Sequence, residues 1–168
     1  SVKIAFKRLV NLVPRRGRIV AFDAAPNVSE CVSNAFCTVE RYGFQADSTW
    51  RLADFSFKDN ASHWHLLRNS RPFADITLPM AGEHNALNAP AAAALAAGQG
   101  VSREAIVEAL ASFRSVRRRL EVCAEVNGIA VIDDFAHHPT AIRETLRALR
   151  AMSWPRTGVR HKQHKLCG

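Results

Sequence analysis

The chain has 168 residues, 48% of them hydrophobic, which is enough for one domain or slightly more with a normal core. No apolar run reaches the roughly 18 residues of a membrane helix, and no signal-peptide pattern opens the chain, so we expect a cytoplasmic protein with no membrane partner. The net charge is +8, but six basic residues and no acid lie from Arg147 onward. The charge is therefore mostly a property of the tail. A non-catalytic basic nucleic-acid-binding module is kept only as an alternative.

The first third of the chain predicts a helix, a strand and a second helix. Apolar residues recur at helical spacing over residues 2–13, and "PRRGR" ends that pattern. "IVAF" at 19–22 has the composition of a short buried strand. Asn27 or Ser29 would then cap a short helix reaching residue 35. This order indicates an α/β layer with parallel strands.

Four short stretches follow that are rich in β-branched and aromatic residues, at 37–44, 48–57, 62–70 and 72–79. Turn signals separate them, so we predict strands, with the later ones antiparallel and tightly connected. We expect His63 and His65 to face opposite sides of their strand. Four cysteines without C-x-x-C spacing complete the case against a zinc site, so no metal ligand is predicted.

Two helices and a hairpin come next. The alanine run 89–97 is a strong helix former, with Pro90 in its first turn and Gly98 after it. A second helix begins after Ser102 as N-cap. "RSVRRR" is a basic connector, and Asn127-Gly128 predicts the turn of a hairpin over residues 120–135. A helix then begins at Pro139, and residues 151–168 are expected to form an irregular basic tail.

The first group of candidate site residues lies in "GEHNALNA". It places His84, Asn85 and Asn88 at the start of the alanine-rich helix, with the two asparagines three apart and so on one face. An asparagine amide has a donor and an acceptor, which match the edge of an adenine. The alternative is a pair of capping amides before a tightly packed helix.

The second group lies in "RRRLE" and "IDDFAHHP". A hydrophobic strand delivers Asp133 and Asp134 at its C-terminal end, where α/β proteins bind ligands, and the next helix points its N-terminal amides there. Asp134 is placed to accept from a ribose hydroxyl, and His137 to donate to an anion or carry a proton. Arginines 117–119 suit phosphate or ribose oxygens. The alternatives are an aspartate cap, surface histidines and a solvated connector.

In this order and spacing, "GEHNALNA", "FRSVRRRLEV" and "VIDDFAHHPTAI" resemble the Mur ligase family over roughly residues 1–150. Within the family, "DDFAHHPTAI" with "RRLEV" is most similar to the murein peptide ligases. These join L-Ala-γ-D-Glu-meso-diaminopimelate to UDP-N-acetylmuramate in peptidoglycan recycling. The branch that adds L-alanine to UDP-N-acetylmuramate tends to have Tyr-Gly where this chain has Phe135-Ala136, and it remains the alternative.

The resemblance implies an α/β fold in two parts. Residues 1–116 would be the later part of the family's central, P-loop NTPase-like domain, with an added antiparallel β region. Residues 117–150 would be the hinge and the first hairpin and helix of a Rossmann-like C-terminal domain.

The resemblance also implies site residues. Asn85 and Asn88 would contact adenine, while Arg119 and Asp134 would hold the ribose or phosphates of ATP across the hinge. His84 and His137 would lie near the nucleotide. His137 is the one candidate here for a catalytic role.

The implied reaction is ATP-dependent amide formation through an acyl phosphate, with Mg²⁺ supplied by other parts of the enzyme. UDP-N-acetylmuramate and a peptide are the implied substrates. The family's phosphate-binding loop ends Gly-Lys-Thr/Ser, and this sequence contains no Gly-Lys pair. We therefore expect the isolated chain not to catalyse ligation.

Overall fold

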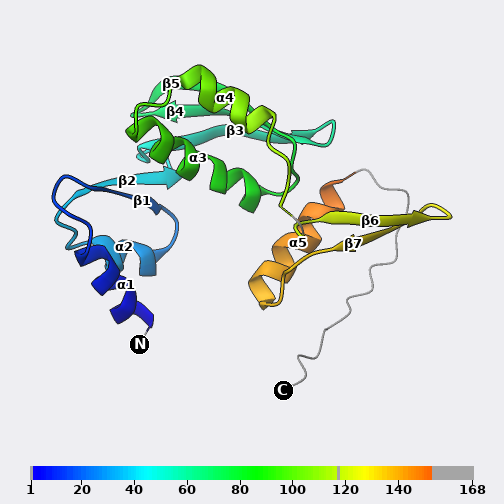
Figure 1. The fold of residues 1–168 in the computed structure, drawn as a ribbon, viewed down its shortest axis with the longest axis horizontal. Helices are drawn as coiled ribbons and strands as arrows, with labels where there is room; N and C mark the ends of the chain where they lie inside the picture. Colours follow the sequence, from blue (N-terminus) through cyan, green and yellow to red (C-terminus); the bar gives the residue numbers. More distant parts are fainter. Residues whose placement is uncertain (1, 117, 153–168) are drawn as a thin grey trace.

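The computed structural model describes residues 2–116 and 118–152. The predicted tail from 153 to 168 lies outside them. The elements are α1 (Val2–Asn11), β1 (Arg18–Phe22), α2 (Pro26–Val32), β2 (Thr38–Gly43), β3 (Trp50–Lys58), β4 (Ala61–Arg68), β5 (Arg71–Leu78), α3 (Glu83–Gly98), α4 (Arg103–Ala111), β6 (Glu121–Val126), β7 (Ile129–Asp133) and α5 (Pro139–Ala151). Figure 1 shows two lobes: the large one runs through α4, and the small one consists of β6, β7 and α5.

One mixed sheet with the order β1-β2-β3-β4-β5 forms the large lobe, which confirms the predicted α/β class. β1, β2 and β3 are parallel neighbours, whereas β3, β4 and β5 are antiparallel. β2 pairs with β3 over only two residue pairs, Tyr42↔Trp50 and Gly43↔Arg51. This offset lets a short connection join two parallel strands, which ordinarily need a longer crossover.

A buried carboxylate holds that short connection in place. Asp23 follows β1 and is 7% exposed. Its Oδ2 accepts from the amide of Gln45 at 3.0 Å and from the hydroxyl of Ser48 at 2.5 Å. The Asp23 carboxylate also occupies the space where a Cβ at Gly43 would stand. Residue 43 therefore has to be glycine for the connection to close.

The core of the large lobe lies between the sheet and α3. Its largest members are Trp50, Leu52, Trp64, Leu66, Ile76 and Leu78, and they pack against the alanines of α3. Small side chains let α3 approach the sheet closely, which is what the alanine run predicts. A second apolar cluster of Val10, Ala21 and Val32 joins α1 and α2 to β1.

Three local expectations were wrong. α2 begins at Pro26 after Ala25, so neither Asn27 nor Ser29 caps it. α3 begins at Glu83, close to the predicted start, but Pro90, which was expected in its first turn, is inside the helix and fully buried. The helix accepts this proline although its ring removes one backbone hydrogen bond. His63 and His65 share the exposed face of β4, because residues two apart on a strand point to the same side. They contact Thr77 and Asp75 of β5.

The small lobe begins with the predicted hairpin. β6 and β7 are antiparallel, and the turn residues Asn127 and Gly128 have φ values of 51° and 75°. Two consecutive positive φ values are the requirement that Asn-Gly meets in a tight hairpin turn. α5 follows with Pro139 in its first turn, as predicted.

Candidate functional site

The first predicted group lies at the start of α3. Gly82, with φ of 98°, makes the turn into the helix. Asn85 is 9% exposed, and its Nδ2 donates to the carbonyl of Ala81 at 2.7 Å. Asn88 is exposed and open to a ligand. The two asparagines thus differ: one amide is tied into the turn, and the other faces solvent.

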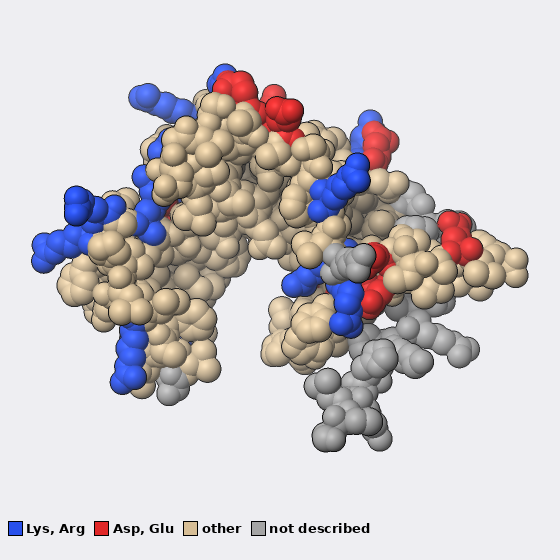
Figure 2. Space-filling view, in the orientation of Figure 1, with Lys and Arg blue, Asp and Glu red and all other residues tan. Residues whose placement is uncertain are grey.

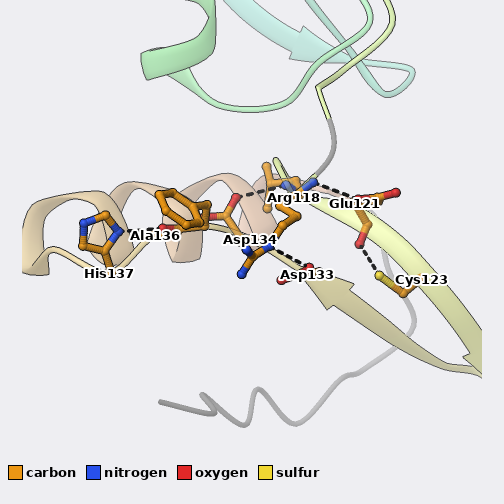
Figure 3. Close-up of polar contacts among 9 residues, drawn as sticks. Arg118, Glu121, Cys123, Asp133, Asp134, Ala136 and His137 are labelled. Atoms are coloured by element: carbon orange, nitrogen blue, oxygen red, sulfur yellow. Dashed lines mark hydrogen bonds and ion pairs between the residues drawn. The ribbon is translucent and has the colours of Figure 1, made fainter. Parts of the chain in front are cut away.

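The second group centres on Asp134, at the end of β7. Its Oδ2 accepts from the amide of Leu120 at 3.0 Å. Its Oδ1 accepts from the amide of Ala136 at 2.8 Å and from the hydroxyl of Thr145 at 3.1 Å. Figure 3 shows Asp134 between the connector and the segment that leads to α5. The carboxylate therefore joins the connector, the strand end and α5.

Arg118, not Arg119, contacts the neighbouring carboxylate. Arg118 Nε lies 3.2 Å from Asp133 Oδ2, and its guanidinium stacks over the Phe135 ring. Arg118 also has a φ of 61°, a left-handed conformation that is uncommon for a residue other than glycine. The exposed Arg119 guanidinium has no hydrogen-bond or ion-pair partner within residues 2–116 and 118–152.

Among the described residues, His137 bonds to the backbone of Phe135 rather than to the carboxylate of Asp134. Its side chain is exposed, and its Nδ1 is 2.9 Å from the carbonyl oxygen of Phe135. The imidazole packs edge-on against the Phe135 ring, with the ring centroids 5.0 Å apart. A proton-carrying role for His137 remains a prediction. Phe135 and Thr145 were missed, because no residue spacing shows which side chains meet around a strand end.

His84 connects the two groups electrostatically. Its ring is half-buried, and its Nδ1 is buried without a hydrogen-bond partner among the described residues. Burial lowers the pKa of His84 below 6.5. The negative charges of Asp134, Glu144 and Glu83 oppose this, and the positive charge of Arg119 adds to it. The start of α3 is therefore close enough to the small lobe for charges there to act on it.

A groove lies between the lobes. It has a volume of about 370 Å³ and is lined by Phe55, Phe57, Gly82, Glu83, Glu144, Arg147, Ala148 and Ala151. None of the six predicted nucleotide residues lines it. Two of them are next to its lining: His84 follows Gly82 and Glu83 in the chain, and Asp134 accepts a hydrogen bond from Thr145, the neighbour of Glu144 on α5. A larger groove of about 640 Å³, with a mostly apolar lining, lies between α1, α2 and β1.

The described part of the chain contains neither a cluster of metal-binding side chains nor a membrane-spanning helix. Residues 2–116 and 118–152 contain no group of three or more His, Cys, Asp or Glu side chains arranged for a metal ion. The described helices include none that is long and apolar enough to cross a membrane. On the face seen in Figure 2, basic side chains stand in separate groups with acidic ones among them, rather than in one continuous patch.

The fold and this junction define a two-lobed α/β protein in which both lobes present polar groups near the segment that connects them. Residues 1–96 match the Mur ligase middle domain, and residues 118–160 match the Mur ligase glutamate ligase domain. The chain belongs to the Mur ligase family, whose members are ATP-dependent amide-bond ligases.

Individual relatives agree with this assignment. The chain is 39% identical over 158 residues to the UDP-N-acetylmuramate–L-alanine ligase of Methylorubrum populi, covering 90% of this chain and 34% of that protein. The murein peptide ligase of Psychrobacter arcticus is 30% identical with a TM-score of 0.67, over 89% of this chain and 32% of that one. The UDP-N-acetylmuramate-alanine ligase of Thermotoga maritima is 26% identical with a TM-score of 0.73, over 89% and 33%. The chain thus spans about a third of the length of the curated relatives it matches.

Proposed function

We propose that this chain is the nucleotide-facing part of a murein peptide ligase. The parent enzyme would join L-Ala-γ-D-Glu-meso-diaminopimelate to UDP-N-acetylmuramate in peptidoglycan recycling, in the cytoplasm. In this proposal residues 1–116 belong to the central domain, 117–150 form the hinge and the start of the C-terminal domain, and 151–168 are a basic tail. The solved murein peptide ligase at 30% identity supports the proposal, as does Phe135-Ala136 in the histidine motif.

The observation that carries a nucleotide site is the convergence of the two lobes at His84. The exposed Asn88 amide follows His84 on α3, and the exposed Arg119 guanidinium is close enough for its charge to act on the His84 ring. An exposed amide suits a purine edge, and an exposed guanidinium suits ribose or phosphate oxygens. We assign Asn88 and Arg119 the direct contacts. Asn85 and Asp134, which already bond to the protein backbone, hold the site in shape.

The reaction proposed for the parent enzyme has two steps. A carboxylate oxygen of UDP-N-acetylmuramate attacks the γ-phosphorus of ATP, so that an acyl phosphate forms and ADP leaves. The peptide amine then attacks the acyl carbon, phosphate leaves and the amine loses a proton. In this proposal the chain's own contribution is to bind and orient the nucleotide, and Mg²⁺ is held through other parts of the parent enzyme. We expect no phosphate release from the chain alone.

A binding experiment tests the nucleotide site directly. ADP is titrated into the full 168-residue chain and the heat is measured. Asn88→Ala and Arg119→Ala should each weaken binding, whereas Arg103→Ala, in an exposed pair with Glu104 on α4, should not. The absence of saturable binding to the wild-type chain would refute the site.

A second candidate is UDP-N-acetylmuramate–L-alanine ligase, favoured by the relative at 39% identity. A chimera experiment separates the two. The chain replaces the matching third of the Psychrobacter arcticus murein peptide ligase, or that of the Thermotoga maritima alanine ligase. Activity with the tripeptide in the first chimera and no L-alanine activity in the second supports the murein peptide ligase. The reverse result supports the alternative.

A further inference from the structure

The two lobes touch through two very small residues. Ala148 is 3% exposed and is the buried residue of α5 within the described chain. Opposite it is Gly82, at the turn into α3. A Cβ added at Gly82 would lie 3.0 Å from the Ala148 Cβ and 2.7 Å from His84 Cε1. A carbon atom added at Gly82 would therefore fit only if the His84 ring and the Ala148 methyl group shifted, and Ala148 itself is buried.

This contact is connected to the hinge through α5 itself. Thr145 lies three residues before Ala148, so the two side chains lie on neighbouring positions of one helix face. The Thr145 hydroxyl donates to Asp134 Oδ1 at 3.1 Å, and Asp134 Oδ2 accepts from the Leu120 amide at 3.0 Å. A displacement of α5 would thus displace the Asp134 carboxylate and the backbone next to Arg119.

We propose that Gly82 and Ala148 are positioning residues that hold α5 against the start of α3 and so fix the spacing between Asn88 on one lobe and Arg119 on the other. The expected effect on nucleotide binding rests on the proposed function, whereas the contact between the lobes is independent of it. Neither residue touches the nucleotide; they act through the helices that carry the binding groups. Misplacing binding groups by about 1 Å is enough to weaken a site severely.

The contact can be measured without any ligand. In the wild-type chain, NMR should show a nuclear Overhauser effect between the Ala148 methyl group and the His84 ring or the Gly82 α-protons. The His84 signal is identified by its loss in His84→Gln. It should titrate with a pKa below 6.5, because burial disfavours the charged ring. The positive charge of Arg119 also lowers this pKa, whereas the negative charges of Asp134, Glu144 and Glu83 raise it. Absence of this Overhauser effect in the folded wild-type chain overturns the proposal, whatever any variant does.

Ala148→Leu should separate the lobes. The larger side chain cannot fit against Gly82, so the His84 ring becomes solvated and its pKa rises toward 6.5. Ala151→Leu is the matched control: it adds the same atoms to the same helix, at an exposed position of the same groove. The control should leave the His84 pKa lowered. A folded Ala148→Leu chain with an unchanged His84 pKa would overturn the proposal.

Nucleotide affinity gives the second readout. Ala148→Leu should raise the Kd for ADP about tenfold or more, and Ala151→Leu should not. Thr145→Ala should also raise the Kd while leaving the His84 pKa lowered, because it cuts the link to Asp134 but keeps the lobe contact. If the wild-type chain shows the contact but binds no ADP, the proposed function fails. If Ala148→Leu opens the contact yet binds ADP as tightly as wild type, the positioning role fails.

Discussion

Replacement of Asp134 by alanine is expected to loosen the small lobe by removing the acceptor that joins three segments. The carboxylate receives two backbone amides, of Leu120 and Ala136, and the Thr145 hydroxyl, at 2.8–3.1 Å. A hydrogen bond to a charged acceptor contributes about 1.5–3 kcal/mol. Asp134 is half-buried, so we take the lower value, about 1.5 kcal/mol, for each of the two amide hydrogen bonds. The Thr145 hydroxyl adds little to the loss, because it can bond to water instead. The expected loss in free energy of unfolding is about 2–3 kcal/mol.

The adjacent acid provides the control for this substitution. Asp133 pairs with Arg118, and the two side chains are 43% and 50% exposed. Exposed ion pairs contribute about 0–1 kcal/mol, so Asp133→Ala should lower the free energy of unfolding by no more than that. The two variants remove the same group from neighbouring residues and differ only in what that group holds.

Urea unfolding and amide hydrogen exchange measure the effect. The Leu120 and Ala136 amides should exchange faster in Asp134→Ala by about 30- to 100-fold, since each factor of ten corresponds to about 1.4 kcal/mol. They should change little in Asp133→Ala. Equal losses in the two variants, or unchanged exchange at Leu120 in Asp134→Ala, would refute the assignment of Asp134 as the group that joins these segments.

Two further predictions concern the large lobe. Gly43→Ala should lower the free energy of unfolding by about 2 kcal/mol or more, because the new Cβ overlaps the Asp23 carboxylate. Gly100 also has a positive φ, but the space around it is open, so Gly100→Ala should lower the free energy of unfolding by less. Thermal unfolding measures both effects. Glu30 should titrate with a pKa of about 2, because Lys3 and Lys7 of α1 donate hydrogen bonds to its carboxylate and favour the charged form. Its contribution to stability is then present above pH 4.5 and lost as the pH falls toward 2, and Lys3→Gln or high salt should raise that pKa in an NMR titration.

Much of the fold follows from local patterns. Alternating and β-branched stretches predicted the strands, and Asn127-Gly128 predicted the hairpin turn that both positive φ values confirm. Ser102 was predicted as an N-cap, and its hydroxyl accepts from the Ala105 amide at 3.2 Å. These features depend on residues within a few positions of one another, which is why the sequence contains them.

Features that depend on distant residues were not predictable. Nothing local indicates that β2 and β3 pair over two residues, because the offset is fixed by Asp23, some twenty residues earlier. Three consecutive arginines also look alike in the sequence. Only the backbone of the folded hinge places Arg118 on Asp133 and leaves Arg119 exposed. The Gly82–Ala148 contact joins residues 66 positions apart and has no local signal.

The central claim is that one nucleotide is bound by groups from both lobes. A double-mutant cycle on the full chain tests it most directly, with the ADP Kd measured for wild type, Asn88→Ala, Arg119→Ala and the double variant. We predict that each single variant raises the Kd. In the double variant the Kd should rise by less than the product of the two single-variant factors, because removing one contact lets the nucleotide shift away from the other. Binding that depends on only one of the two residues would contradict a shared site.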